Sequence, residues 1–457
     1  MTGTIKNIRL TRNPYLLFLP FLLLYIIVVL LLQSAPLWGD EIRHFTEAQN
    51  LLHGFYSPPA PKVEIRNGPG YPLVLALLLA VHVPLICIKL FNAVMLYLSI
   101  VFLFKAMIQV VSFRKALIIG LFWGCYYNSL DFIAMLYSEV FTAFLVSLLV
   151  YFLISAFKPG NNKTAKKYIY LAGFTLGFIA LTKIIFGYVM LCMLIGTALL
   201  WLINRHAANY KRGVAIVLIA LATVIPYLSY TYYLTGRIFY WGTSGGNNLY
   251  WMTSLAENEY GSWFADPVAA KADSVTVKKE VQNAEPGNRF TIKNRNVDSY
   301  GSEDSVRVHH LKNFEEINSY YGVERDDAYK RIVMKNLKSN PGKFIKNCFS
   351  NVGRMLFNYP YSYTPQKPGT LVRLPLNGVI VVLMLFCLVP TFRNWRKIIY
   401  PVRFLLFIAL LYLGGSVFGS AEIRMFTVVV PILLLWIAFI IERSVTIKFK
   451  FGESSKE

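Results

Sequence analysis

The sequence predicts an all-α polytopic membrane protein with about ten transmembrane helices, interfacial helices and one mixed insert on the outer face. The chain has 457 residues, of which 56% are hydrophobic and 15% are charged, whereas a soluble domain carries about 25% charged residues. Apolar runs long enough to cross a bilayer, about 18 residues or more, recur along the chain. Of the 24 acidic residues, 14 lie between Glu257 and Asp327, so the polar residues gather in one insert.

The apolar runs divide the chain into about ten spans, of which the third and fifth are short. The expected spans are Tyr15–Pro36, Leu85–Met107, Ala116–Asn128, Tyr137–Phe157, Tyr168–Thr182, Ile184–Ile203, Val214–Thr235, Leu376–Thr391, Val402–Phe418 and Met425–Ile441.

The charges of the connecting loops support this count. Every second connection is basic and contains no acid, as the positive-inside rule requires of cytoplasmic loops. These connections hold Lys105, Arg114, Lys115, Lys158, Lys163, Lys166, Lys167, Arg205, Lys211, Arg212, Arg393, Arg396 and Lys397. Both termini are then cytoplasmic, and the first span is an uncleaved helix rather than a signal peptide. The net charge of +22 follows from these loops, so no nucleic-acid partner is expected.

The predicted organisation has three parts. Residues 1–235 form a membrane domain with a first outer loop at 37–84, residues 236–375 form a periplasmic insert, and residues 376–457 hold the last spans and a cytoplasmic tail. Within the outer loop, Tyr71–Val83 is too short to span and suits a helix lying in the interface. In the insert, Asp326–Phe357 predicts a helix pair broken at Asn340-Pro341, and the polar stretch Asp266–Arg307 is expected to be flexible.

Cysteine and histidine patterns give no metal or disulfide signal. Four of the five cysteines sit in apolar runs and none forms a CxxC pair, so they are interpreted as small buried hydrophobes. The six histidines have no metal-site spacing and are interpreted as surface or packing residues.

Seven carboxylates outside the insert all fall at or near the outer surface on this topology. Ionisable groups close to a bilayer are costly and mark functional sites by default, so their convergence predicts a polar cavity that opens outward. They are Asp40, Glu41, Glu47, Glu64, Asp131, Glu139 and Glu422.

The pair Asp40-Glu41, which directly follows the first span, is the strongest candidate for chemistry. A carboxylate here can accept a proton from an attacking hydroxyl if shielding raises its pKa, and together with Glu139 it can hold a divalent cation. The alternative is that Asp40 only caps the helix beginning near Ile42. Glu47, on the same helical face, is expected to be a solvated surface residue.

Four further features are candidates for binding. Glu139 opens the fourth span, and its alternative role is a helix cap, as it is for Asp131. Lys183 and Arg424 stand where a lipid phosphate lies and can pair with it, although snorkelling or a local ion pair would also explain them. The loop Gly242–Asn248 can present backbone N–H groups to a phosphate, but a plain turn is the commoner explanation.

Several motifs together resemble the GT-C superfamily of membrane glycosyltransferases, in particular the bacterial branch related to protein O-mannosyltransferases and the lipid A aminoarabinose transferase. The motifs are Gly39-Asp40-Glu41, Gly68-Pro69-Gly70-Tyr71-Pro72, Tyr137-Ser138-Glu139, the helix from Gly173 to Lys183 and Glu422-Ile423-Arg424-Met425. The sequence departs from the family at Met425, which is usually Tyr, and at Asn67, which is often Pro.

The resemblance implies an inverting enzyme that transfers a sugar from a polyprenyl-phosphate carrier to a lipid, glycan or protein acceptor. Asp40, with Glu41 beside it, matches the position of the base, and Glu139 matches a second acidic position. Lys183 and Arg424 match basic positions near the lipid phosphate, and Arg66 and Tyr71 at the Gly/Pro turn are counted with them.

The resemblance also implies the setting of the reaction. The enzyme would lie in the bacterial inner membrane with a periplasmic active site. No cofactor would be required, although a divalent cation is possible. The alternatives are a transporter or flippase for lipid-linked glycans, against which no inverted repeat is found, and an inactive scaffold.

Overall fold

The computed structural model describes residues 13–33, 37, 39–158, 162–203, 208–264, 303–363, 366, 370–371 and 374–444. Within these ranges the regular elements are helices and none is a β-strand, which confirms the predicted all-α class. The expected flexible stretch Asp266–Arg307 lies outside the described residues as far as position 302.

In the part of the chain that the structure describes, seven helices are long and apolar enough to cross a membrane. They are α6 (Leu85–Met107), α9 (Ser138–Ala156), α11 (Ile185–Ile203), α12 (Ala208–Thr235), α18 (Leu374–Arg393), α19 (Tyr400–Phe418) and α20 (Ile423–Ser444). At the other three expected positions lie α3 (Leu19–Leu32), α7 (Phe113–Gly124) and α10 (Asn162–Thr182). The first two are short and α10 begins with lysines, so the total of about ten spans stays a prediction.

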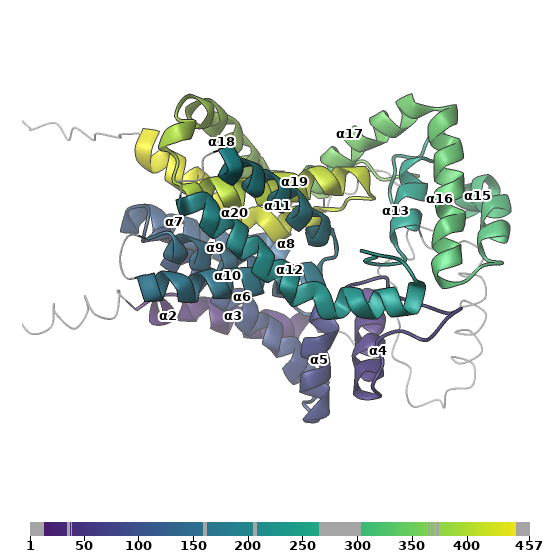
Figure 1. Cartoon of the computed structure of the whole chain (residues 1–457), viewed down its shortest axis with the longest axis horizontal. Coiled ribbons are helices and arrows are strands. Elements are labelled where there is room, and N and C mark those ends of the chain that lie inside the picture. The colour runs from purple at the N-terminus through teal and green to yellow at the C-terminus, as the bar shows by residue number, and fades with distance from the viewer. Residues whose placement is uncertain are drawn as a thin grey trace, which may run out of the picture.

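The centre of the bundle is formed by α9 and α20, which pack against each other (Figure 1). Both are apolar on almost every side, the pattern of a helix surrounded by others. Helix α9 also contacts α6 and α10, and α10 contacts α12. The outer helices α11 and α18 instead have only 33% and 22% of their most apolar stretches buried, as expected for helices that face lipid.

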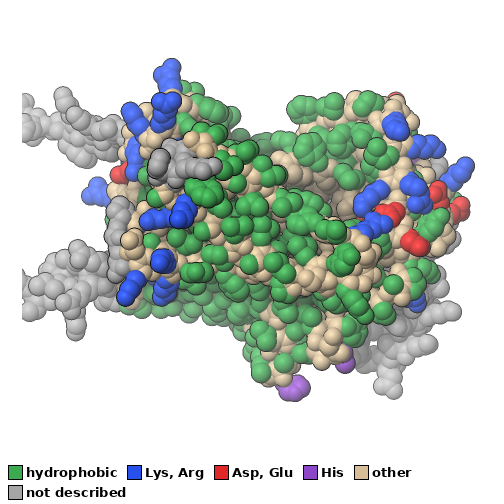
Figure 2. Space-filling model, in the orientation of Figure 1, with side chains coloured by type: hydrophobic (Ala, Val, Ile, Leu, Met, Phe, Trp, Pro, Cys, Tyr) green, Lys and Arg blue, Asp and Glu red, His purple; other side chains and the backbone are tan. Residues whose placement is uncertain are grey.

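The two ends of the bundle differ in charge (Figure 2). Apolar side chains cover its middle, while Lys and Arg gather at the end away from the insert, where α6 is joined to α7. This is the end that the loop charges predict to be cytoplasmic.

The opposite end carries the first outer loop and the insert (Figure 1). The loop contains α4 (Asp40–Leu52) and the short apolar α5 (Gly70–Ala80). The described part of the insert contains α13 (Gly245–Met252), α15 (Glu303–Ile317), α16 (Gly322–Ser339) and α17 (Pro341–Phe357). The predicted helix break at Asn340-Pro341 is confirmed, and Asn340 caps α17 by accepting the Lys343 N–H.

A small hydrophobic cluster holds the insert helices together, separately from the core of the bundle. It combines aromatic and aliphatic residues of α13, α15 and α16: Tyr250, Trp251, Phe314, Ile317, Ala328, Tyr329, Ile332 and Val333. The insert therefore has a core of its own.

Two glycines let the first outer loop pack against the end of α10. A Cβ atom built on Gly68 would lie 1.9 Å from the backbone oxygen of Leu181, and one on Gly70 would lie 2.5 Å from Oγ1 of Thr182. The Gly68-Pro69-Gly70 turn is therefore in direct backbone contact with the segment that leads into Lys183.

We expect Gly68→Ala to destabilise the protein, because a backbone carbonyl cannot move aside as a flexible side chain can. Overpacking of this kind costs about 1–3 kcal/mol. The measurement is the thermal unfolding temperature of the purified protein in detergent. The control is Gly196→Ala in α11, where an added Cβ meets open space. Equal unfolding temperatures for both variants would show that the contact at Gly68 is not a constraint.

Candidate functional site

A cavity of about 280 Å³ opens between the first outer loop, the outer ends of the spans and the loop before α13. Five of the seven sequence-predicted site residues line it: Asp40, Arg66, Glu139, Lys183 and Arg424. They come from α4, the loop before α5, the start of α9, the α10–α11 connection and the start of α20. The structure thus brings these charged groups together at one end of the bundle, as the sequence predicts.

Asp40 lies in the first turn of α4, directly after Gly39, whose φ of 59° is one that a glycine adopts without strain. The carboxylate does not cap the helix: it accepts a hydrogen bond from Nη1 of Arg424 at 2.7 Å and lies 3.0 Å from Nη2 of Arg43. Burial alone would raise the pKa of Asp40, but the charges of Arg424 and Arg43 hold it well below its usual value. Asp40 therefore has a lowered pKa and not the raised pKa expected for a base.

Glu139 joins the same network from the first turn of α9. Its side chain is only 3% exposed, and Oε1 lies 2.7 Å from Nζ of Lys183 and 3.6 Å from Nη1 of Arg424. Arg424 also pairs with Glu422 at 2.9 Å. Lys183 thus faces a carboxylate in the cavity, which replaces the snorkelling alternative for this residue.

Arg424 occupies the place between the two carboxylates where the sequence allows a divalent cation. No group of three or more His, Cys, Asp or Glu side chains suited to a metal ion occurs among the described residues. The cavity lining holds four Lys or Arg and three Asp or Glu side chains. Its charge therefore favours an anionic ligand slightly.

Two predicted residues lie outside the cavity lining. Glu41 is fully buried, accepts a hydrogen bond from the Leu136 N–H at 2.9 Å and lies 3.7 Å from Nζ of Lys89. Tyr71 is buried with its ring against His44 and Phe141. Both residues support the walls of the cavity and do not face its interior.

Sequence reasoning misplaced Glu47 and overlooked His44. Glu47 is 5% exposed, so the prediction of a solvated surface residue is wrong. His44 lines the cavity, and its Nδ1 lies 3.4 Å from Oε2 of Glu47. The signal was the spacing of positions 40, 44 and 47, which places all three on one face of α4. Asp131, a further candidate, does not line the cavity.

The Gly242–Asn248 loop borders the cavity, but some of the backbone N–H groups proposed for a phosphate are bonded within the protein. The Thr243 N–H donates to the Ile65 carbonyl at 3.1 Å, and the Gly246 N–H donates to Asp326 at 2.7 Å. These N–H groups are already used, so the loop contributes the side chains of Ser244, Asn247 and Asn248.

Comparisons with known proteins give structural matches only. No family profile and no curated protein matches the sequence. The crystal structure of ArnT from Cupriavidus metallidurans bound to undecaprenyl phosphate matches 93% of this chain and 76% of its own, at 13% identity and a TM-score of 0.42. Archaeoglobus fulgidus oligosaccharyltransferase tethered with an acceptor peptide matches 93% of this chain and 49% of its own, at 12% identity and a TM-score of 0.46.

The archaeal oligosaccharyltransferase AglB in complex with an inhibitory peptide and a dolichol-phosphate gives a similar match, at 13% identity and a TM-score of 0.44. It covers 92% of this chain and 50% of AglB. The matched structures are those of GT-C glycosyltransferases, the class that the motifs resemble. At these identities and scores the likeness assigns no substrate.

We expect Arg424→Gln to destabilise the protein, because several carboxylates lose their shared partner. Breaking a fully buried pair costs roughly 3–5 kcal/mol, and the effect is smaller here because the Arg424 side chain is 25% exposed. Pairing with Arg424 lowers the pKa of Asp40 in the folded protein. The stabilisation from this pair is therefore fully present above the pKa that Asp40 has in the unfolded chain. It is lost as the pH falls through the lower folded-state pKa.

The measurement is the unfolding temperature in detergent between pH 7 and about pH 3. The difference between wild type and Arg424→Gln should shrink toward acid. Arg43→Gln should have a smaller effect, because Asp40 keeps Arg424. A difference independent of pH would contradict the ion-pair network.

Proposed function

We propose that this chain is a GT-C-type inverting glycosyltransferase that moves a sugar from a polyprenyl-phosphate carrier to an acceptor on the outer face of the bacterial inner membrane. The observation that carries the proposal is the convergence of Asp40, Glu139, Lys183 and Arg424, from four separate elements, in one cavity. Paired acids and cations at the edge of a helix bundle provide both a proton acceptor and a site for a phosphate leaving group.

The donor phosphate is assigned to Lys183 and Arg424. Both residues stand at ends of membrane-spanning helices, and the cavity beside them is also lined by Ile184, Ile185 and Gly415. A polyprenyl phosphate must keep its chain in hydrocarbon while its head reaches a cation, and this mixed lining suits that requirement. Arg and Lys both form strong charge-assisted hydrogen bonds to phosphate oxygens.

The proposed reaction breaks the bond between the anomeric carbon and the phosphate oxygen and forms one bond to the acceptor oxygen. The acceptor attacks from the face opposite the phosphate, so the configuration inverts. The bonding electron pair leaves with the phosphate, whose charge Lys183 and Arg424 stabilise. The acceptor proton passes to the Asp40 carboxylate.

The low pKa of Asp40 fits this role if the proton is transferred late, after the bond between the acceptor oxygen and the sugar has begun to form. An acceptor oxygen becomes acidic as its bond to the sugar forms, so a weak base suffices at that stage. In addition, a bound phosphate competes with Asp40 for Arg424. Donor binding therefore releases Asp40 from its strongest partner and raises its proton affinity when a base is needed.

The acceptor is proposed to be a lipid, glycan or protein that reaches the cavity from the periplasmic side, and no cofactor is assigned. Orientation with both termini in the cytoplasm is supported by the basic end of the bundle in Figure 2.

We expect Asp40→Asn and Glu139→Gln each to lower sugar transfer by about 100-fold or more, the usual effect of removing a general base or its supporting charge. The assay uses purified protein, radiolabelled polyprenyl-phosphate sugar and membrane extract as the source of acceptor. Asp327→Asn is the matched control, because Asp327 pairs with Arg237 outside the cavity. Transfer undiminished in Asp40→Asn would remove Asp40 as the base.

The same assay tests the alternatives. Movement of the labelled lipid across a vesicle membrane without sugar transfer would favour a transporter. Transfer abolished by EDTA and restored by one divalent cation would add a metal to the site.

We expect Cys348 of α17 to react with a membrane-impermeant maleimide in intact spheroplasts, in a variant whose other cysteines are replaced. Lys166→Cys, at the basic end of the bundle, should react only after permeabilisation. The reason is that the proposed cavity opens on the same side as α17. Reversed accessibility would place the cavity in the cytoplasm and contradict the proposed donor and acceptor.

A further inference from the structure

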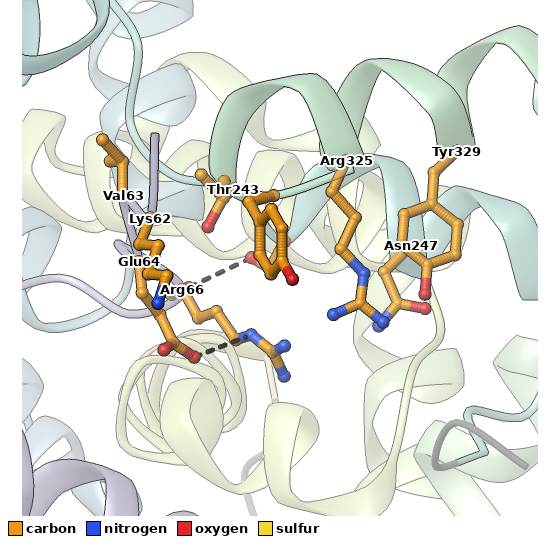
Figure 3. Close-up of a pocket in the computed structure, with 11 residues that line it drawn as sticks. Lys62, Val63, Glu64, Arg66, Thr243, Asn247, Arg325 and Tyr329 are labelled. Atoms are coloured by element: carbon orange, nitrogen blue, oxygen red, sulfur yellow. Dashed lines mark hydrogen bonds and ion pairs between the residues drawn. The ribbon is translucent and has the colours of Figure 1, made fainter. Parts of the chain in front are cut away.

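A second pocket of about 230 Å³ lies next to the reaction cavity, on the side of the insert (Figure 3). We name it the outer pocket. The residues that matter here are Lys62, Glu64 and Arg66 of the first outer loop, Asn247 of α13, and Tyr321 and Arg325 at the start of α16. Since a water molecule occupies about 30 Å³ in the liquid, the pocket has room for much more than a single ion.

The outer pocket adjoins the reaction cavity. Arg66, Ser244 and Asn247 line both spaces. The Ser244 hydroxyl donates to the Arg66 carbonyl at 3.0 Å, which fixes the wall that the two spaces share. A ligand in the outer pocket would therefore lie beside the cavity that Asp40 and Arg424 line.

Positive charge dominates the outer pocket. Three cations face one carboxylate, Glu64, which lies 3.3 Å from Nε of Arg66. In Figure 3, Arg66 and Arg325 extend into the same space from opposite sides. Burial, together with the like charges of Arg43 and Arg325, lowers the pKa of Arg66, and only Glu64 opposes this strongly. An anion between the two guanidinium groups would relieve their repulsion.

The pocket also offers groups suited to a sugar. The amide side chain of Asn247 lines the pocket, and its Oδ1 accepts no hydrogen bond from the described residues, so the amide has hydrogen-bonding capacity left for a ligand hydroxyl. Tyr321, which is 56% exposed, also lines the pocket. A hydroxyl-bearing ring with an anionic substituent would match the acceptor atom, the aromatic face and the cations together.

The position of the outer pocket distinguishes between the two possible sources of the anion, the carrier lipid and the acceptor. No residue of the seven membrane-spanning helices lines it, whereas the reaction cavity is lined by α9, α19 and α20. A phosphate attached to a polyprenyl chain must stay near hydrocarbon. The carrier lipid therefore belongs in the reaction cavity. The outer pocket is then the site for the acceptor, which approaches from the aqueous side.

We propose that the outer pocket is the acceptor subsite and that it binds an acidic sugar, one that bears a carboxylate or a phosphate. This inference rests on the proposed transferase function. Lys62, Arg66 and Arg325 bind the anionic group, and Asn247 accepts a hydrogen bond from a hydroxyl of the same sugar. The attacking hydroxyl then lies on the side of the sugar that faces Asp40.

The first test measures binding of glucuronate, as a soluble probe, to the purified full-length protein by titration calorimetry, with glucose as the uncharged comparison. Glucuronate should bind more tightly than glucose, and added salt should weaken it. Lys62→Gln and Arg325→Gln should each weaken glucuronate binding by about tenfold, as expected for loss of one charge-assisted hydrogen bond. Lys335→Gln, an exposed lysine further along α16, is the matched control and should bind as wild type does.

The second test separates the two sources of the anion. Lys62→Gln and Arg325→Gln should raise KM for acceptor in the transfer assay, while binding of undecaprenyl phosphate stays unchanged. Two variants are used because Arg325 also donates to Asn318, and Lys62 lies on a different element. Weakened undecaprenyl phosphate binding with unaltered glucuronate binding would assign the pocket to the carrier and overturn the proposal.

The outcomes also separate this proposal from the proposed function. Equal glucuronate affinity in wild type and both variants, in a protein that transfers sugar, would overturn the acidic acceptor while the transferase stands. Charge-dependent glucuronate binding in a protein that transfers no sugar would support the acidic-sugar site and contradict the transferase.

Discussion

Arg424 pairs with three carboxylates at this end of the bundle, and the arrangement of the cavity depends on this pairing. Its guanidinium contacts Asp40, which is 384 positions away in the chain, as well as Glu139 and Glu422. Carboxylates brought together beside a hydrocarbon layer repel one another and lose hydration. A planar cation with several donors satisfies them together in a way that a lysine could not. In the proposed reaction, an incoming phosphate would have to displace a carboxylate from Arg424, so donor binding and activation of the site would be linked.

Sidedness makes the main cavity predictable from the sequence. Because the loop charges predict which helix ends lie on the same side, the pattern of charges alone places these carboxylates and Lys183 at one end of the bundle. Sidedness does not predict on which face of a helix a given side chain lies. Asp40 and Glu41 are neighbours in the chain, but consecutive helical residues point about 100° apart. One therefore faces the cavity and the other packs against Lys89. A prediction by motif treats the two alike, although their surroundings differ.

The outer pocket has no comparable signal in the sequence. Arg66 and Arg325 are far apart along the chain, and neither the first outer loop nor α16 has a pattern that predicts contact with the other. Their approach depends on how the insert helices fold on their own small core. The Gly242–Asn248 loop shows the same limit. Its composition suggests exposed N–H groups, yet the Gly246 N–H is bonded to Asp326, a residue of α16 that only tertiary structure brings there.

Asp326 ties α16 to the 240–248 segment that follows α12. Its buried carboxylate accepts hydrogen bonds from the Gly246 N–H and the Tyr240 hydroxyl and pairs with Lys330. The loop that it holds carries Ser244 and Asn247, which belong to both cavities. Helix α16 is therefore not exchangeable by itself. A chimera that borrows α16 from another protein would have to bring the matching 240–248 segment with it, because a crossover between residue 248 and α16 would separate Asp326 from the groups that it holds.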